Sequence, residues 1–291
     1  MTSKISLGTA QFGMDYGIAN DKGKPSLEKV KSILKKAKNL GVKNIDTASV
    51  YGASESILGQ IGVSDFNLTT KIPSIPIESV DINAYVNNII EESLNKIKIK
   101  EFHGVLLHDS EQLFNKEVES DIHNALISLK DNGLTKKVGI SIYDPNKLSQ
   151  LNSIESYDIV QCPYNLFDRR LESSNWMEKL SDYGIEIQIR SIFLQGLLLM
   201  EKHKRPTKFK KWNDLWDDLD NWLKKNNISA VDACLNFSFE SKYIDSVVLG
   251  VDSEEQLNEI FNKINNENKA YPKNIFSNDV NLINPVNWSS L

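Results

Sequence analysis

Four polar residues suited to acid–base chemistry stand at, or just after, the ends of short apolar segments. Asp46 and Lys71 close two of these segments, His108 closes a third, and Tyr51 lies in the loop that follows Asp46. If the segments are parallel strands of one barrel, their carboxyl ends converge on one face, which is where such barrels form active sites. The four side chains are therefore predicted to meet in one site.

These residue types suit the reduction of a carbonyl group, which needs a hydride on carbon and a proton on oxygen. A tyrosine has an ordinary pKa of about 10, and a nearby ammonium such as that of Lys71 lowers it toward the working range. Asp46 is expected to keep Lys71 charged and oriented, and His108 to donate a hydrogen bond to the carbonyl oxygen. None of these groups carries a hydride, so a nicotinamide is the simplest source.

The elements that must position these residues alternate between short β-branched segments and helical patterns. Apolar residues recur at helical spacing from Val30 to Leu40 and from Val86 to Ile97, and turn residues separate the two kinds of segment. Eight such units, without a glycine-rich phosphate loop after the first strand, favour a closed (β/α)8 TIM barrel over a doubly wound sheet. The expected strands are Ile5–Ala10, Val42–Asp46, Asn67–Lys71, Phe102–His108, Lys137–Ser141, Ile154–Gln161, Ile185–Arg190 and Ile244–Leu249.

The composition excludes several classes of protein. Hydrophobic residues make up 40% of the chain and charged residues 25%, as in ordinary globular proteins, and the net charge of −5 argues against a general nucleic-acid binder. No segment approaches the roughly 20 apolar residues that cross a bilayer, and the N-terminus shows no signal-peptide pattern. Cys162 and Cys234 lack metal-type spacing, so neither a disulfide nor a zinc site is predicted. We expect a cytoplasmic protein without a metal, membrane or nucleic-acid partner.

The length of 291 residues is enough for two average domains, but (β/α)8 barrels run as one domain at about 250 residues. We expect a single barrel domain over residues 1–291, with a polar tail, 266–291, that wraps the surface without regular structure. The basic segment Glu201–Lys211 follows the seventh expected strand, where barrel enzymes often place a mobile loop. Beyond it, a set of apolar residues is spaced for one helical face and is interpreted as packing: Trp212, Trp216, Leu219 and Trp222.

The sequence around the four polar residues resembles the signature of the aldo-keto reductase superfamily. The segment Asp46-Thr-Ala-Ser-Val-Tyr51-Gly-Ala-Ser-Glu55-Ser-Ile-Leu-Gly59 carries it, and the strand ends Thr70–Lys71 and Leu106-Leu-His108-Asp109 follow in the family's order. The resemblance spans nearly the whole chain, from Leu7-Gly-Thr-Ala-Gln-Phe-Gly13 to Leu249-Gly-Val-Asp-Ser253. It implies that Asp46, Tyr51, Lys71 and His108 form a catalytic tetrad. It also implies that NADH or NADPH binds extended across the barrel mouth, without a metal.

The resemblance also implies which residues contact the cofactor. Ser141 and Gln161 match residues that bind the nicotinamide carboxamide, although the asparagine that commonly follows that serine is Ile142 here. Arg190 stands where an aromatic residue often stacks on the nicotinamide, and a guanidinium plane can stack there as well. The other implied contacts before the eighth strand are Gly8, Thr9 and Asp46 at the first two strand ends, and Ser191, Leu194 and Gly196 in the loop that lines the pyrophosphate.

The segment after the eighth strand departs most from the family pattern. Gly250-Val-Asp-Ser-Glu-Glu-Gln256 aligns with the part that often grips the adenosine 2′-phosphate, but it is acidic and Gln256 replaces the usual arginine. A 2′-phosphate gains most from a bidentate arginine, and Asp252 repels it. Ile260 also replaces an asparagine that commonly binds adenine. The choice between NADPH and NADH stays open, because the basic run Lys202–Lys211 could fold over the cofactor. The implied contacts here are Gly250, Asp252, Ser253, Gln256 and Glu259.

Each of these residues, taken alone, also has an ordinary structural explanation. Asp46 and Lys71 could form a structural ion pair, and Tyr51 or His108 could be half-buried residues at a rim. The acidic run could be a helix start with Ser253 as its N-cap. The ordered occurrence of all four residues within one signature favours catalysis.

The predicted function is an oxidoreductase that reduces a small aldehyde, ketone or sugar carbonyl with NADH or NADPH. The same four residues serve the oxidative direction, so an NAD-dependent sugar dehydrogenase, or an isomerising relative in carbohydrate assembly, is the first alternative. A cofactor-sensing regulatory subunit is the second, because the family contains barrels that partner membrane channels. A purely structural barrel has no need of four polar groups at one mouth. The sequence does not determine the substrate or the oligomeric state.

Overall fold

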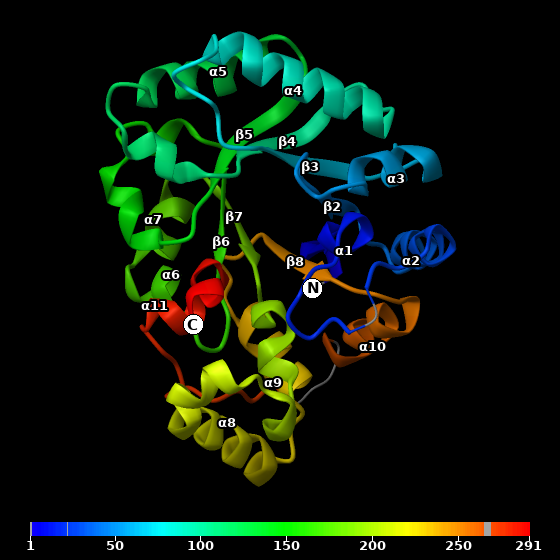
Figure 1. Ribbon diagram of the computed structural model, residues 1–291, viewed down its shortest axis with the longest axis vertical. Helices are drawn as coiled ribbons and strands as arrows, with labels where there is room; N and C mark the ends of the chain where they lie inside the picture. Colours follow the sequence, from blue (N-terminus) through cyan, green and yellow to red (C-terminus); the bar gives the residue numbers. More distant parts are fainter. Residues whose placement is uncertain (1, 22, 265–268) are drawn as a thin grey trace.

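Eight parallel strands close into a barrel in the computed structural model, which describes residues 2–21, 23–264 and 269–291 (Figure 1). Each strand pairs with the next in sequence order, and β8 pairs with β1 to close the ring. The predicted (β/α)8 TIM barrel is confirmed. The strands are β1 Ile5–Gly8, β2 Asn44–Asp46, β3 Asn67–Ile72, β4 Phe102–Leu107, β5 Thr135–Ser141, β6 Ile159–Pro163, β7 Glu186–Arg190 and β8 Ser246–Gly250.

Helices surround the barrel and cover the outer face of its sheet (Figure 1). Helix α2, Leu27–Asn39, is capped by Ser26 and buries a stripe from Val30 to Ala37, as its helical spacing predicts. Helix α4, Ile82–Ile97, is capped by Asp81 in the same way. The remaining helices are α1 Ala10–Gly13, α3 Ser54–Ile61, α5 Glu119–Asp131, α6 Arg170–Ser173, α7 Trp176–Asp182, α8 Asn213–Asn226, α9 Ala230–Glu240, α10 Glu254–Ile264 and α11 Val280–Ile283.

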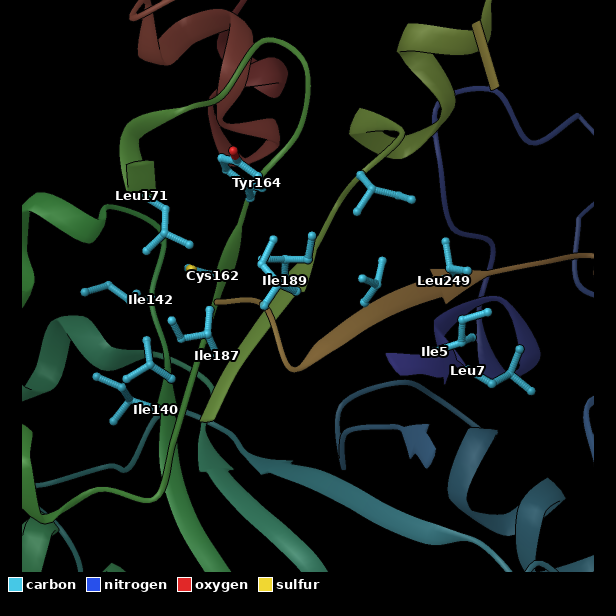
Figure 2. Packing of buried hydrophobic residues seen from close by; sticks show 14 of the residues in the cluster. Ile5, Leu7, Ile140, Ile142, Cys162, Tyr164, Leu171, Ile187, Ile189 and Leu249 are labelled. Atoms are coloured by element: carbon cyan, nitrogen blue, oxygen red, sulfur yellow. The ribbon is translucent and has the colours of Figure 1, made fainter. Parts of the chain in front are cut away.

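The strands are buried on both faces, which explains why they appear as continuous apolar runs. Figure 2 shows Ile140, Cys162 and Ile187, from the neighbouring strands β5, β6 and β7, within the hydrophobic core. Each fully buried side chain of this kind contributes about 1.5–3 kcal/mol of transfer free energy. Cys162 is a buried free thiol, as predicted.

Each of the eight strands differs from its predicted range by at least one residue at an end, and for two of them the local reason is clear. β1 ends at Gly8 rather than Ala10, because Ala10 is already the first residue of α1. β6 does not include Ile154–Ser156, since these residues form a 3₁₀ turn, and it continues past Gln161 to Pro163. The functional residues still lie at strand ends, so the site is unaffected.

The predicted tail without regular structure is confirmed for residues 269–279 and wrong for residues 280–290, while residues 266–268 lie outside the described residues. The tail forms α11 and a 3₁₀ segment, Pro285–Ser290. Leu282, Ile283 and Trp288 are buried, and the ring of Trp288 packs edge-on against Phe209. These three apolar side chains anchor the tail to the protein core. The polar composition of the tail gave no indication of this anchoring.

Two cations of the basic segment bind parts of the protein surface. Arg205 pairs with Asp220 of α8 at 2.8 Å, and Lys208 Nζ donates to the Trp288 carbonyl oxygen at 2.6 Å. These cations therefore tie α8 and the tail together. Trp216 and Leu219 are buried on α8, which confirms their packing role. Across the described ranges, no helix is both long enough and apolar enough to cross a membrane.

Candidate active site

The carboxyl ends of β2, β3 and β4 bring the four predicted residues together. Lys71 Nζ lies 2.6 Å from Asp46 Oδ1 and 5.2 Å from the centre of the Tyr51 ring. The rings of Tyr51 and His108 meet edge to face, with their centres 5.9 Å apart. Residues far apart in the sequence therefore form one cluster, as the strand-end argument requires.

The Lys71–Asp46 ion pair is buried, with 1% and 3% of the two residues exposed. Lys71 Nζ also donates to the carbonyl oxygen of Thr47 at 3.0 Å. Burial lowers the pKa of Lys71, and the Asp46 carboxylate opposes that change by stabilising the ammonium. Asp46 thus takes the place predicted for it, as the partner of a desolvated cation.

Tyr51 differs from expectation in the direction of its pKa change. Burial, and then the Asp46 carboxylate, raise the pKa of Tyr51 above its ordinary value of 10.0, and the Arg190 guanidinium is the cation that opposes them. The expectation that Lys71 lowers this pKa is therefore wrong, because Asp46 stands beside the same phenol and burial disfavours its anion. The phenol remains protonated at neutral pH, which suits a proton donor.

His108 is a neutral imidazole at neutral pH. Burial, followed by the charges of Lys71 and Arg190, lowers its pKa from 6.5 to about 3. Its backbone N–H donates to the Ile72 carbonyl oxygen at 2.9 Å, which fixes the residue just beyond the end of β4. A neutral imidazole can donate a hydrogen bond to a carbonyl oxygen without adding a third cation to the cluster.

Two glycines hold the loop that carries Tyr51 against the end of α1. A Cβ at Gly13 would lie 1.8 Å from the Tyr51 carbonyl oxygen, and one at Gly52 would lie 2.4 Å from the Gly13 carbonyl oxygen. The Ala53 N–H donates to that Gly13 oxygen at 3.3 Å. Two backbone segments therefore approach too closely for any side chain, and this approach positions Tyr51.

Gly13→Ala should therefore displace Tyr51 and lower kcat by an order of magnitude or more, since an error of about 1 Å can cost about 100-fold in rate. The measurement is kcat for a carbonyl substrate, with circular dichroism to confirm folding. Gly133→Ala is the control for backbone strain without a clash, because φ at Gly133 is +70° but a Cβ there meets nothing within 4 Å; it should cost stability and leave kcat unchanged. A folded Gly13→Ala protein with wild-type kcat would show that the contact does not position Tyr51.

Gln161 contacts the cluster from β6. Its Nε2 donates to Asp46 Oδ2 at 2.7 Å and to Gln188 Oε1 at 3.1 Å, so Asp46 is shared between Gln161 and Lys71. Gln161 Oε1 and Ser141 Oγ are buried and have no hydrogen-bond partner among the described residues. The two residues are cross-strand neighbours. A primary carboxamide could donate to that oxygen and accept from that hydroxyl, so the pair fits the carboxamide of a nicotinamide.

A cleft of about 350 Å³ opens beside Tyr51, within the size range of small-molecule sites. Other residues of the predicted site do not line it. Lys71, Ser141 and Gln161 are buried behind it, Leu194 is in the hydrophobic core, and His108 contacts the Tyr51 ring. Ser253 caps α10 by accepting from the Gln256 N–H at 3.3 Å. The predicted residues that do line the cleft are Gly8, Thr9, Asp46, Tyr51, Arg190, Ser191, Gly196, Gly250, Asp252, Gln256 and Glu259.

Several residues that line the cleft, in the segments after β1 and β7, were not predicted from the sequence. Gln11, Tyr16 and Asn20 come from the first segment, and Phe193 and Gln195 from the second. Burial, and then the neighbouring Tyr51, raise the pKa of Tyr16, so the two phenols lie close together. No motif marks these residues in the sequence. Only their position after a barrel strand could have identified them, because the loops after barrel strands line the active-site face.

The comparison with known proteins decides the family. The model of the Aldo/keto reductase family matches residues 4–272. This chain belongs to the aldo-keto reductase family. It is 25% identical to the oxidoreductase YqkF of Bacillus subtilis (strain 168), over 88% of this chain and 85% of that protein. It is also 25% identical to L-galactose dehydrogenase of Arabidopsis thaliana, over 88% of this chain and 82% of that one.

A solved structure supports the fold of this aldo-keto reductase. The holo form of the aldo-keto reductase AKR11C1 from Bacillus halodurans superposes with a TM-score of 0.71. The match covers 93% of this chain and 94% of that chain, at 18% sequence identity. Membership in the family makes the protein an oxidoreductase of the class that acts on carbonyls with NAD(P)H.

Proposed function

We propose that this aldo-keto reductase reduces an aldehyde, ketone or sugar carbonyl, with Tyr51 as the general acid assisted by Lys71, Asp46 and His108. The observation that supports this most directly is the buried Lys71–Asp46 pair beside the Tyr51 ring, at the wall of a ligand-sized cleft. A purely structural ion pair has no need of a phenol at the wall of this cleft, or of a neutral imidazole packed against that phenol.

The chemistry follows from the protonation states of these side chains. Bound NADH or NADPH supplies the hydride. The Tyr51 hydroxyl donates its proton to the carbonyl oxygen as negative charge develops there, and His108 donates a hydrogen bond to the same oxygen. The Arg190 guanidinium stabilises the phenolate that Tyr51 becomes. A proton from solvent then restores the phenol.

The cofactor contacts are proposed from the cleft and from the unpaired polar atoms. Ser141 and Gln161 hold the carboxamide, Gly8 and Thr9 lie along the path of the dinucleotide, and Ser191 and Gly196 lie beside it. At the β8 end of the cleft, Gly250, Asp252, Gln256 and Glu259 offer no cation for a 2′-phosphate. Arg205 and Lys208 of the basic run bind α8 and the tail instead. This charge distribution supports NADH over NADPH.

The test is the transfer of deuterium from NADH and from NADPH, each labelled at nicotinamide C4, to a panel of aldehydes, ketones and sugars. We expect an alcohol that carries deuterium on the former carbonyl carbon, with faster transfer from NADH than from NADPH. A protein that binds cofactor tightly but transfers no deuterium to any carbonyl would instead match the cofactor-sensing regulatory subunit.

The oxidative direction is the second candidate, and one relative favours it. L-galactose dehydrogenase, which this chain resembles over 88% of its length, carries that activity in its name. In that direction Tyr51 acts as the base and accepts the hydroxyl proton of a sugar. Incubation with NAD⁺ and a panel of aldoses, followed at the absorbance of NADH, measures it.

A further inference from the structure

Arg190 differs from the buried cations of this chain because no anion accompanies it. Lys71 pairs with Asp46, and Arg170 pairs with Asp168 at 2.8 Å. Within residues 2–21, 23–264 and 269–291, no carboxylate lies within 4.0 Å of the half-buried Arg190. Its polar side-chain contact is from Nη1 to Ser191 Oγ at 3.5 Å. A partly desolvated guanidinium without a close counter-charge places a positive charge at the β7 end of the cleft, whereas Asp252 and Glu259 line its β8 end.

The sheet places this cation where a nicotinamide would lie. Arg190 is the last residue of β7 and pairs in register with Pro163 of β6, the strand that carries Gln161. A ring whose carboxamide meets Ser141 and Gln161, and whose hydride reaches a carbonyl held by Tyr51, lies over this end of the sheet. The Arg190 guanidinium carbon lies 4.4 Å from the centre of the Tyr143 ring, so Tyr143 supports the cation from one side.

The carboxylate of Asp46 does not offset this charge. Asp46 shares the cleft with Arg190, but its oxygens already accept from Lys71 Nζ at 2.6 Å and from Gln161 Nε2 at 2.7 Å. Lys71 and Arg190 together carry two positive charges against one carboxylate, while Tyr51 and His108 are neutral at neutral pH. The cluster is therefore cationic by one charge, on the side where the reacting ring would sit.

We propose that Arg190 makes the site select the redox state of its cofactor, binding reduced nicotinamide more tightly than oxidised nicotinamide. The reduced ring is uncharged and the oxidised ring carries one positive charge, so only the oxidised ring is repelled by the guanidinium. This inference rests on the proposed function. From a mixture of both forms the enzyme loads the reduced cofactor and, once the hydride has left, holds the oxidised form weakly. The site is thereby poised for carbonyl reduction rather than alcohol oxidation.

The experiment is isothermal titration calorimetry of NADH and of NAD⁺ with no carbonyl substrate present. For the wild-type protein we expect NADH to bind at least about tenfold more tightly, which corresponds to about 1.4 kcal/mol. Arg190→Gln should bring the two dissociation constants within about threefold, mainly by improving NAD⁺ binding. Arg190→Lys keeps the charge and should keep most of the preference.

Lys147→Gln is the matched control, because it removes the same charge from a residue outside the cleft that pairs with Glu111. It should leave the NADH preference unchanged. Thermal denaturation confirms that each variant is folded.

Equal affinity of the wild-type protein for NADH and NAD⁺, or an unchanged preference in Arg190→Gln, overturns the inference. A loss in Arg190→Gln of affinity for an anionic carbonyl compound, with the preference intact, also overturns it and assigns Arg190 to the substrate. These results leave the proposed function standing if labelled cofactor still transfers its deuterium. Failure of the wild-type protein to bind either nucleotide would overturn both.

Discussion

Tyr51→Phe should lower kcat by on the order of 10²–10⁴-fold, the usual contribution of a positioned proton donor. The phenyl ring keeps its edge-to-face contact with His108 and its place beside Lys71, so the cleft keeps its shape and only the proton is lost. Binding of NADH should therefore change little. The measurements are steady-state kcat on a carbonyl substrate and the NADH dissociation constant by calorimetry.

The control for Tyr51→Phe is Tyr183→Phe, which removes an exposed hydroxyl that does not line the cleft. The pH dependence gives an independent readout. The pKa of His108 is about 3 and that of Tyr51 lies above 10, so both groups stay neutral and kcat/KM should be flat from about pH 5 to pH 8. A Tyr51→Phe protein with more than about a tenth of the wild-type kcat would contradict the assigned role.

Asp46→Ala should destabilise the fold by about 3–5 kcal/mol, because it leaves the Lys71 ammonium buried without a counter-charge. Gln161 Nε2 also loses its acceptor at 2.7 Å. The double variant Asp46→Leu with Lys71→Met should recover part of the loss, since an apolar pair avoids the buried charge. The measurement is the free energy of unfolding from urea denaturation, compared among the three proteins.

The matched control is Asp65→Ala, which breaks an ion pair with Lys38 whose side chains are 66% and 60% exposed. Its urea midpoint should stay close to the wild-type value, because solvent screens such pairs. Equal destabilisation in Asp46→Ala and Asp65→Ala would mean that the buried Lys71–Asp46 pair contributes no more to the free energy of unfolding than an exposed pair. It would also weaken the argument that Asp46 holds Lys71 charged.

The sequence by itself determined the barrel and the place of its catalytic face. Apolar stripes such as Val30 to Ala37 record which side of a helix is buried, and continuous apolar strands record burial on both faces. The strand ends at Asp46 and Lys71 followed from the same periodicity. Because carboxyl ends of parallel strands share one face, the cluster was predictable without any distance.

Only the tertiary structure decided the electrostatics of that cluster. It also decided where the C-terminal tail and the basic segment lie. Whether the Tyr51 pKa rises or falls depends on burial of the phenol and on the charges around it. Neither can be read from the spacing of residues in the sequence. Gln161 donates a hydrogen bond to Asp46 across the barrel, and no carboxylate of the described residues lies within 4.0 Å of Arg190. Both facts depend on how side chains from separate strands come together. The tail is ordered by Trp288, whose burial against Phe209 no local pattern records. Periodicity reports the environment of one segment, whereas pairing and desolvation arise only between segments.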